Sequence, residues 1–410
     1  MSRTVWIVLA LITGLGAGIV LRAAGPSGLG VAEAIRPIGQ LWLNALQMTL
    51  TPLVFCLMTV GVAGAARAAG TGRLVAVALA AFIGLLIAGS MLGAAAAEGF
   101  LALWPVHAIR SAPALSALTT NGSPSLVSEI LTLVPTNPVA AAAQSAMTPL
   151  IVFAAFFGAA ISRLSGEDGD RLIGFFRAAG DALLTIVGWV LRLAPLGIFV
   201  LAVGAAASVG LAAAGGLIQY ALLLSAVLAL GVVAALGLGL ASGVGPGRFL
   251  RAVAAPAALA ASTQSSMACL PALVKAAQED LGLPPALVGV LMPMAVTVFR
   301  FGNVVGGVSA GLIGARLFGI DPGLPQIILA ICVGVLTNIG VMGLPGPAVL
   351  LASYGPIFIA LGAPIEALFL LLAVDTLPDI LDTTANVTAD LAVTAIIGRV
   401  AKRVTEPQPS

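Results

Sequence analysis

The segment DTLPDILDTTANVTAD (Asp375–Asp390) is a strongly polar stretch in a chain that is otherwise apolar. It holds four of the 16 acidic residues of the sequence, Asp375, Asp379, Asp382 and Asp390. At about 100° per residue of an α-helix, these positions and Asn386 project within an arc of about 80°. Carboxylates inside a membrane are expensive, and they normally face a cavity, a cation or a partner residue. The stripe therefore predicts a ligand site on this helix, with Thr383 at its edge.

The composition of the whole chain places it in a lipid bilayer. Hydrophobic residues make up 60% of its 410 residues and charged residues 8%, whereas a soluble domain carries about 25% charged residues. The net charge of +2 and the lack of a basic, aromatic-interleaved surface exclude nucleic acid as a partner. One histidine and three scattered cysteines predict neither a transition-metal site nor a disulfide framework. We therefore expect an integral membrane protein that binds no cofactor.

Apolar segments of about 20 residues cross a bilayer as helices. Charged residues and Pro/Gly clusters delimit expected spans near 5–22, 39–63, 73–104, 128–163, 175–209 and 213–243, and further segments near 251–280, 284–314, 326–362 and 365–400. If the first six spans alternate from a cytoplasmic N-terminus, 12 basic residues fall on that side and four on the other, as the positive-inside rule requires. We expect a multi-pass protein of the cell (inner) membrane with both termini cytoplasmic.

Lys402 and Arg403 remain cytoplasmic only if the segments near 251–280 and 326–362 each enter and leave the membrane on the same side. A Thr/Ser run and Pro271 interrupt the first in ASTQSSMACLPAL (Ala261–Leu273), and glycines and prolines interrupt the second in TNIGVMGLPGPAV (Thr337–Val349). Backbone that leaves a helix at membrane depth is tolerated only inside protein or against a cavity. Two such breaks predict a binding site near the midplane, as in many secondary transporters. A pair of merely kinked helices is the alternative.

Six segments match one known family in its order along the chain, from about residue 40 to residue 400. They are LWLNALQMTLTPLVF (Leu41–Phe55), LVPTNPVAAAAQSAMTPLIVFAAFFGAAIS (Leu133–Ser162), IVGWVLRLAPLGIFVL (Ile186–Leu201), QSSMACLP (Gln264–Pro271), GLPGPAV (Gly343–Val349) and TTANVTADLAVTAIIGR (Thr383–Arg399). On these motifs the chain resembles the glutamate transporter homologues, the dicarboxylate/amino acid:cation symporters, as a divergent member.

This resemblance implies an all-α membrane protein with eight transmembrane helices and two re-entrant helical hairpins, assembled as a homotrimer. It implies an elevator mechanism, in which a transport domain moves against a scaffold and hairpin 2 is the gate. The scaffold would comprise residues 1–72 (helices 1–2) and 126–212 (helices 4–5, which also trimerise). The transport domain would comprise 73–125 (helix 3 and an extracellular loop) and 213–402 (helix 6, hairpin 1, helix 7, hairpin 2, helix 8). A disordered tail would follow at 403–410.

The resemblance also implies roles for residues that would bind the substrate. Asp379 matches the aspartate that holds a substrate's amino group. Thr383 and Asn386 match residues that contact the backbone groups of an amino acid. Ser265 and Ser266 match the serines of hairpin 1 that lie near the substrate carboxylate. These matches imply a small-molecule substrate, an amino acid or organic acid, bound within the bilayer.

The gate and one cation site are matched as well. Three residues match the tip of the gate: Gly343, Pro345 and Gly346. Asn386 and Asp390 match ligands of a sodium site, and Thr297 is the surviving residue of the cation motif of helix 7. These three residues therefore form the expected residual cation site, where hard oxygen donors suit a small cation.

Two departures from the family change what the site is expected to bind. Dicarboxylate-selective members carry an arginine at the position of Asp382 or, in hairpin 1, of Gln264, and neither is an arginine here. Sodium-coupled members read Asn-Met-Asp-Gly-Thr in helix 7, where residues 299–303 read Phe-Arg-Phe-Gly-Asn. The two sodium-ligating positions are thus phenylalanines, which offer no oxygen, and Arg300 stands between them.

A guanidinium in the middle of a membrane needs a partner. One hypothesis places Arg300 beside Asp382, and near Asp390, as a tethered charge that weakens or abolishes sodium coupling. A second has Arg300 bind a substrate carboxylate bidentately, and a third makes it part of a purely structural ion pair. Asp379 or Asp382 could instead carry a coupling proton, so that the coupling ion is either Na+ or H+.

The sequence therefore favours a secondary active transporter of a small amino acid or carboxylate. Asp379 favours a ligand with an amino group, and Asp382 disfavours a dicarboxylate unless Arg300 neutralises it. A sodium-coupled dicarboxylate symporter, a non-transporting substrate sensor and an anion channel are the alternatives. An enzyme is not expected, because no histidine or lysine base accompanies Ser265 and Ser266.

Overall fold

The computed structural model describes residues 3–69, 73–106, 134–144, 146–164, 167–340 and 347–405, and every regular element within these ranges is helical. The first half forms α1 (Arg3–Ala23), α2 (Pro26–Ala69), α3 (Arg73–Leu103), α5 (Pro138–Ala143), α6 (Met147–Arg163), α7 (Glu167–Arg192), α8 (Ala194–Val209) and α9 (Leu211–Ala241). The second half forms α10 (Pro246–Thr263), η1 (Met267–Cys269), α11 (Leu270–Lys275), the π-helical η2 (Ala276–Asp280), α12 (Pro285–Val298), α13 (Phe301–Leu317), α14 (Leu324–Gly340), α15 (Pro347–Ala360), α16 (Ile365–Leu371), η3 (Leu372–Val374) and α17 (Thr376–Thr405). The expected all-α class is confirmed.

Many of these helices are apolar enough to lie in a bilayer. Within the described ranges, six segments are long and apolar enough to cross it: Pro26–Arg67, Leu74–Leu103, Glu167–Arg192, Ala214–Ala241, Pro285–Leu317 and Thr376–Arg399. Shorter apolar helices lie at Leu9–Ala23, Met147–Arg163, Ala194–Ser208, Leu324–Ile339 and Leu350–Ala360. Their lengths and composition fit a multi-pass membrane protein.

Several boundaries differ from the sequence prediction, mostly at prolines. The span expected at 39–63 lies within the much longer α2, which continues through Pro37 and Pro52. A proline inside a helix removes one hydrogen bond and kinks the helix, but need not end it. The span expected at 175–209 is instead two helices, α7 and α8, with a proline in the first turn of α8. At the other end of the chain, α17 continues to Thr405, beyond the expected start of the tail at residue 403.

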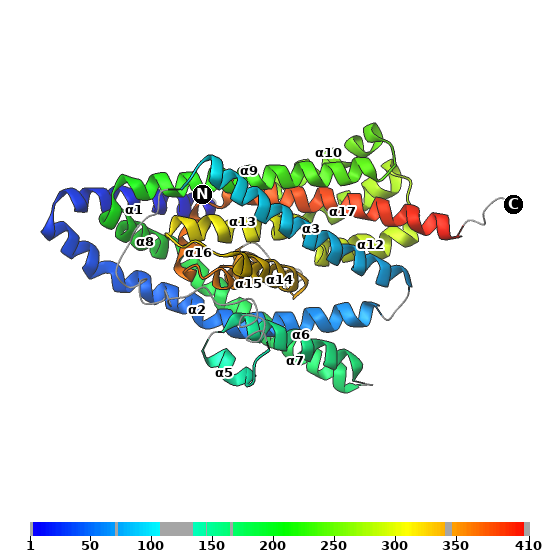
Figure 1. Cartoon of the computed structure of the whole chain (residues 1–410), viewed down its shortest axis with the longest axis horizontal. Helices are drawn as coiled ribbons and strands as arrows, with labels where there is room; N and C mark the ends of the chain where they lie inside the picture. Colours follow the sequence, from blue (N-terminus) through cyan, green and yellow to red (C-terminus); the bar gives the residue numbers. More distant parts are fainter. Residues whose placement is uncertain are drawn as a thin grey trace.

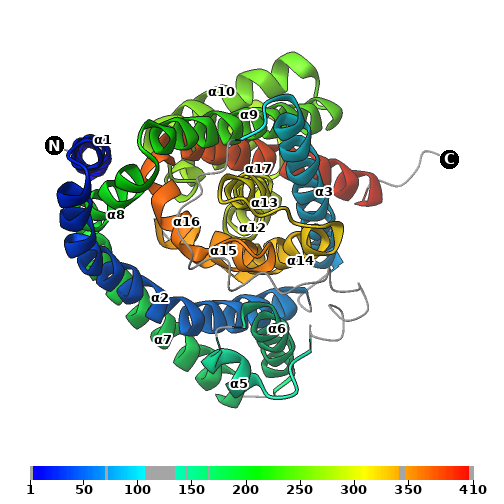
Figure 2. The same cartoon turned by 60° about the vertical axis from the view of Figure 1, so that its left-hand side comes forward.

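The helix α13 is at the centre of the molecule (Figure 2). Every residue from Phe301 to Ala315 is buried, and the helix contacts α3, α9, α14, α15 and α17. Glycine allows α3 to approach α13 closely at Gly93. A side chain there would clash, because its Cβ would lie 2.4 Å from the carbonyl oxygen of Val305. Lipid tails are as apolar as side chains, so tight packing and buried polar contacts hold membrane helices together.

Except for α3 and α9, the helices of the first half form an outer layer. α2 packs against α6, α7 and α8, and α1 packs against α8 (Figure 1). Phe55 of α2 stacks on Phe153 of α6 with ring centroids 6.0 Å apart, and it meets Phe176 of α7 edge-on at 5.6 Å. In Figure 2, α1, α2 and α7, with α5 and α6, form an arc outside the helices that enclose α13.

One segment of the second half folds back on itself after α10. The Arg248 guanidinium, at the beginning of α10, donates to the carbonyl oxygen of Asp280, at the end of η2. The two ends of this segment therefore lie together. Its turn begins at Gln264, where a φ of 51° places the backbone in the left-handed region.

A second fold-back consists of α14 and α15. The Thr337 hydroxyl lies 3.4 Å from the carbonyl oxygen of Ser353, and a Cβ at Gly334 would lie 3.3 Å from the side chain of Ile357. Since higher numbers on α14 face lower numbers on α15, the two helices are antiparallel. The residues that connect them, 341–346, lie outside the described ranges.

Candidate functional site

The central helix is broken at the candidate site. α12 ends at Val298 and α13 begins at Phe301, and between them Phe299 (φ −98°, ψ 81°) and Arg300 (φ −103°, ψ 77°) are not helical. Such a break leaves the last carbonyls of one half and the first amides of the other without intrahelical partners. The sequence delimits an apolar segment near 284–314 but does not locate a break within it, because neither Phe299 nor Arg300 is glycine or proline.

Asn386 of α17 caps the second half of the broken helix. Its Oδ1 accepts hydrogen bonds from the backbone amides of Gly302, at 2.8 Å, and Asn303, at 3.4 Å. Its amide nitrogen donates to Asp382 Oδ1 at 3.4 Å. Glycine is required at position 302, since a Cβ there would lie 2.4 Å from the backbone carbonyl oxygen of Asp382. α13 and α17 thus share a buried polar contact at the break.

The remaining stripe residues line the same face of α17. Asp382, Thr383 and Asp390 are buried, whereas Asp375 and Asp379 are partly exposed. Both carboxylate oxygens of Asp390 are buried and make no hydrogen bond within the described part of the chain. A buried charge without compensation is strongly destabilising. Asp390 therefore requires a proton, a cation or a nearby guanidinium.

Arg300 supplies the positive charge of the site. Its partly exposed side chain interacts electrostatically with Asp379, Asp382 and Asp390. Among the described residues, however, no carboxylate lies within 4.0 Å of its guanidinium. Arg300 therefore forms no direct ion pair with Asp382, the residue beside which the first hypothesis places it. The charge of Arg300 acts on the stripe over a longer distance.

The two phenylalanines of the break belong to the apolar packing. Phe299 is fully buried and stacks on Phe82 of α3, with ring centroids 5.0 Å apart. Phe301 is also buried, and its ring packs closely on Gly89 of α3. A Cβ at Gly89 would lie 2.7 Å from the ring. Oxygen ligands for a cation are therefore missing from both side chains, and α3 holds the rings in place.

The tip after α10 carries the two expected serines to the beginning of α17. Gln264 Nε2 donates to the carbonyl oxygen of Thr376 at 3.0 Å, which joins the tip to the last helix. Ser265 and Ser266 follow directly and are partly exposed, and Ser265 Oγ accepts from the backbone amide of Ala268 at 3.4 Å. Outside the described residues lie the three expected residues of the gate tip, Gly343, Pro345 and Gly346.

The three residues of the expected cation site, Thr297, Asn386 and Asp390, differ in how their side-chain oxygens are used. Thr297 Oγ1 donates to the carbonyl oxygens of Pro293, at 2.8 Å, and Met294, at 3.1 Å. Asn386 Oδ1 already accepts from two backbone amides. Both carboxylate oxygens of Asp390 make no hydrogen bond within the described part of the chain, and the Thr297 hydroxyl oxygen keeps lone pairs that can still accept.

Sequence reasoning missed two buried asparagines beside the break. Asn303 Nδ2 donates to Asn338 Oδ1 at 3.0 Å, and Asn338 Nδ2 donates to the Val298 carbonyl oxygen at 3.3 Å. Asn338 could have been noticed, because it is an amide side chain within the apolar sequence of α14. A buried amide requires hydrogen-bond partners, and this predicts a polar contact with a neighbouring helix.

Apolar helices around a broken helix, with carboxylates and amides gathered at the break, are the arrangement of a multi-pass membrane transporter. The chain belongs to the sodium:dicarboxylate symporter family, whose model matches residues 4–400. It is similar to the proton/glutamate-aspartate symporter of Escherichia coli (27% identity over 90% of this chain and 86% of the relative). It is also similar to the human neutral amino acid transporter B(0) (30%, over 98% and 82%) and the proton/sodium-glutamate symport protein of Geobacillus stearothermophilus (25%, over 97% and 95%). The resemblance in the sequence motifs is confirmed.

Proposed function

We propose that this chain is a secondary active transporter of a small amino acid or organic acid, with reduced or absent sodium coupling. The packing of Phe299 against Phe82 supports this most, because a buried aromatic ring occupies a position expected to ligate sodium. The guanidinium of Arg300 adds a fixed positive charge beside it. One relative is named as a proton symporter, one as a proton/sodium symporter and one as a neutral amino acid transporter, so the names are compatible with a proton as coupling ion and with an uncharged substrate side chain.

Substrate would bind between the stripe of α17 and the tip after α10. Asp379 would hold the amino group, Ser265 and Ser266 the carboxylate, and Thr383 and Asn386 the other backbone groups. The hydrogen bond from Gln264 to the Thr376 carbonyl supports this placement, since Thr376 lies about one helical turn before Asp379. The carboxylate of Asp382 favours a neutral side chain over an acidic one.

A dicarboxylate is the second candidate substrate, and one observation favours it. The Arg300 guanidinium forms no ion pair within 4.0 Å among the described residues. Its planar fork is therefore available to bind a substrate carboxylate bidentately. In that case Arg300 would replace the arginine that the family otherwise places at the positions of Asp382 or Gln264.

Movement would follow an elevator mechanism. The transport domain would comprise residues 73–125 and 213–402, and the scaffold residues 1–72 and 126–212. The contacts of α13 with α3, α9, α14, α15 and α17 support the first grouping, and those of α2 with α6, α7 and α8 support the second. The segments α10–η2 and α14–α15 would be the two re-entrant hairpins, with α14–α15 as the gate. The contact of Arg248 with Asp280 supports the first, because it brings both ends of that segment together.

The transporter would assemble as a homotrimer in the cell (inner) membrane, with cytoplasmic termini. The three expected gate-tip residues, Gly343, Pro345 and Gly346, would close over the substrate. Native mass spectrometry of the protein in nanodiscs tests the assembly directly. A trimer mass is expected, and a monomer mass would contradict this part of the proposal.

Counterflow in proteoliposomes tests the transport function. Labelled serine, alanine, aspartate, glutamate and succinate are each offered to vesicles preloaded with the same unlabelled compound. The label should accumulate transiently inside the vesicles for one of the two classes, the neutral amino acids or the dicarboxylates. Asp379→Asn should abolish the accumulation, whereas Asp181→Asn, the same change at an exposed position on α7, should not. Ligand binding without counterflow would indicate a substrate sensor, and single-channel current steps would indicate an anion channel.

A further inference from the structure

Asn338 joins α14 to both halves of the broken helix. Its Nδ2 donates to the carbonyl oxygen of Val298, the last residue of α12, at 3.3 Å, and its Oδ1 accepts from Asn303 Nδ2, in the first turn of α13, at 3.0 Å. The backbone amide of Asn303 donates in turn to Asn386 of α17 at 3.4 Å. Asn303 is 4% exposed and Asn338 0%. Separating α14 from the break would therefore leave buried amide groups unpaired, which is costly.

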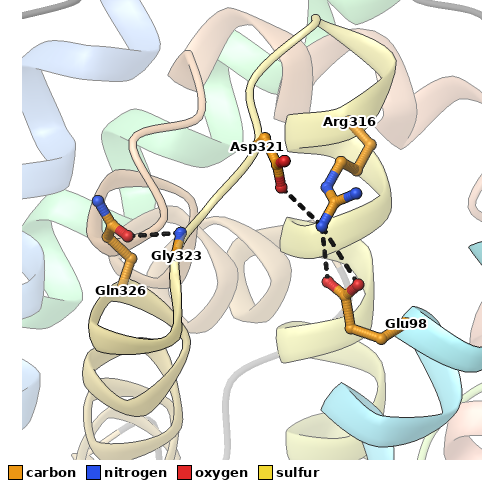
Figure 3. Close-up of polar contacts among 5 residues, drawn as sticks. All are labelled: Glu98, Arg316, Asp321, Gly323 and Gln326. Carbon is orange, nitrogen blue, oxygen red and sulfur yellow. Dashed lines mark hydrogen bonds and ion pairs between the residues drawn. The ribbon is translucent and has the colours of Figure 1, made fainter. Parts of the chain in front are cut away.

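An ion-pair cluster holds the beginning of α14 in place (Figure 3). Arg316, near the end of α13, lies between Glu98 of α3 and Asp321 of the turn into α14. Its Nη2 is 3.2 Å from Glu98 Oε2 and 2.7 Å from Asp321 Oδ1. The Gly323 amide donates to Gln326 Oε1 at 2.6 Å, which closes the first turn of α14. These contacts fix the beginning of α14 to α3 and α13.

The Asn338 hydrogen bonds and the Arg316 ion-pair cluster would respond differently to a rotation of α14. Asn338 lies 14 residues beyond Leu324, which is about 21 Å along the helix. A rotation of about 10° about the beginning of α14 would carry Asn338 about 4 Å, enough to break both of its hydrogen bonds. The same rotation would hardly displace Asp321, which lies next to the pivot. The contacts of Asn338 are therefore the ones that break when α14 lifts.

We propose that Asn338 and Asn303 are positioning residues that hold α14 against the broken helix and thereby set how long a substrate stays bound. This inference rests on the proposed transport function, in which α14–α15 is the gate. Both residues act through the position of α14 rather than by binding the substrate. Loss of the amide pair and of the bond to Val298 should lower the closed-to-open ratio of α14 roughly tenfold.

A buried thiol on α14 measures this ratio without any substrate. Val333→Cys places the thiol at a residue that is 2% exposed. In the same protein, alanine replaces the three native cysteines, Cys56, Cys269 and Cys332. The rate at which a membrane-impermeant methanethiosulfonate reagent modifies the thiol in nanodiscs then reports the lifting of α14.

Asn338→Leu should raise the modification rate about tenfold. Asn303→Leu should raise it less, because Asn338 then keeps its bond to Val298, and this variant also serves if Asn338→Leu fails to fold. The double variant should match Asn338→Leu alone, since the two residues act through one contact. Effects that simply add in the double variant would contradict a shared contact.

Thr337→Val is the matched control. The Thr337 hydroxyl is also fully buried, but it bonds within the α14–α15 pair, to the carbonyl oxygens of Val333 and Ser353. Its loss should leave the modification rate unchanged. An unchanged rate in both asparagine variants, or an equal rise in Thr337→Val, would overturn the proposal.

Substrate dissociation provides the second measurement. In the variant with Asn338→Leu, the dissociation rate of a bound substrate should rise by the same factor as the thiol modification rate. A rise in thiol modification with an unchanged dissociation rate would overturn the link to substrate dwell time. Because the thiol assay needs no substrate, it is decisive for the contact even if counterflow shows that the chain does not transport.

Discussion

The Oδ1 atom of Asn386 lies 2.8 Å from the backbone nitrogen of Gly302. This contact ties the polar face of α17 to the first turn of α13, across the break in the central helix. The first amides of a helix carry partial positive charge, and the side-chain oxygen of Asn386 satisfies two of them. That oxygen is consequently occupied by protein donors at a position expected to ligate sodium. The site is organised by its own hydrogen bonds and by the charge of Arg300.

Gly302→Ala should destabilise the protein and abolish substrate binding. The new Cβ would lie 2.4 Å from the Asp382 carbonyl oxygen, a backbone atom that cannot move away without displacing α17. Overpacking of this kind costs about 1–3 kcal/mol, which should appear as a lower melting temperature in detergent. Gly289→Ala on the exposed face of α12 is the control, because a Cβ there meets nothing within 4 Å. Equal melting temperatures of the two variants would contradict the close approach of α13 and α17.

Asn386→Leu should leave the backbone amides of Gly302 and Asn303 without their acceptor. Each unsatisfied buried donor costs about 1–3 kcal/mol, so we expect a clear loss of thermal stability and of substrate affinity. Thr394→Val, a buried change on the same helix, removes only a 4.0 Å contact with the Met292 sulfur and should be nearly neutral. If Asn386→Leu is as stable as Thr394→Val, the cap contributes nothing to the fold.

Arg300→Met should abolish binding of the substrate found by counterflow, because it removes the positive charge that acts on Asp379, Asp382 and Asp390. Adding Asp382→Asn removes one of the uncompensated charges, and we expect it to restore binding of a neutral amino acid. Isothermal titration with each variant measures this. Arg192→Met, at an exposed position on α7, is the control and should bind normally. Failure of Asp382→Asn to restore any binding would instead favour the dicarboxylate candidate.

The polar face of α17 could be predicted from the sequence, and the break in the central helix could not. Helical periodicity alone places Asp382, Asn386 and Asp390 on one face, and all three are buried. The break, by contrast, is stabilised by groups remote in sequence, the side chains of Asn386 and Asn338. Neither Phe299 nor Arg300 is glycine or proline, so the sequence does not place the break, which depends on the packed helices.

The location of Arg300 could be predicted from the sequence only in part. The sequence places Arg300 within an apolar segment, and its need for a partner predicts that it lies near the acidic stripe. Its separation from Asp382 does not follow from the sequence, because that depends on the non-helical backbone of the break and on the packing of Phe299 against Phe82.

The sodium dependence of uptake tests the central claim most directly. Initial uptake of the substrate found by counterflow is measured in proteoliposomes at equal pH and ionic strength, with either sodium chloride or choline chloride outside. Because buried phenylalanines occupy the expected sodium-ligand positions and Asn386 is occupied by backbone amides, uptake should be equal in the two buffers. Uptake that occurs in sodium chloride and is absent in choline chloride would contradict the claim.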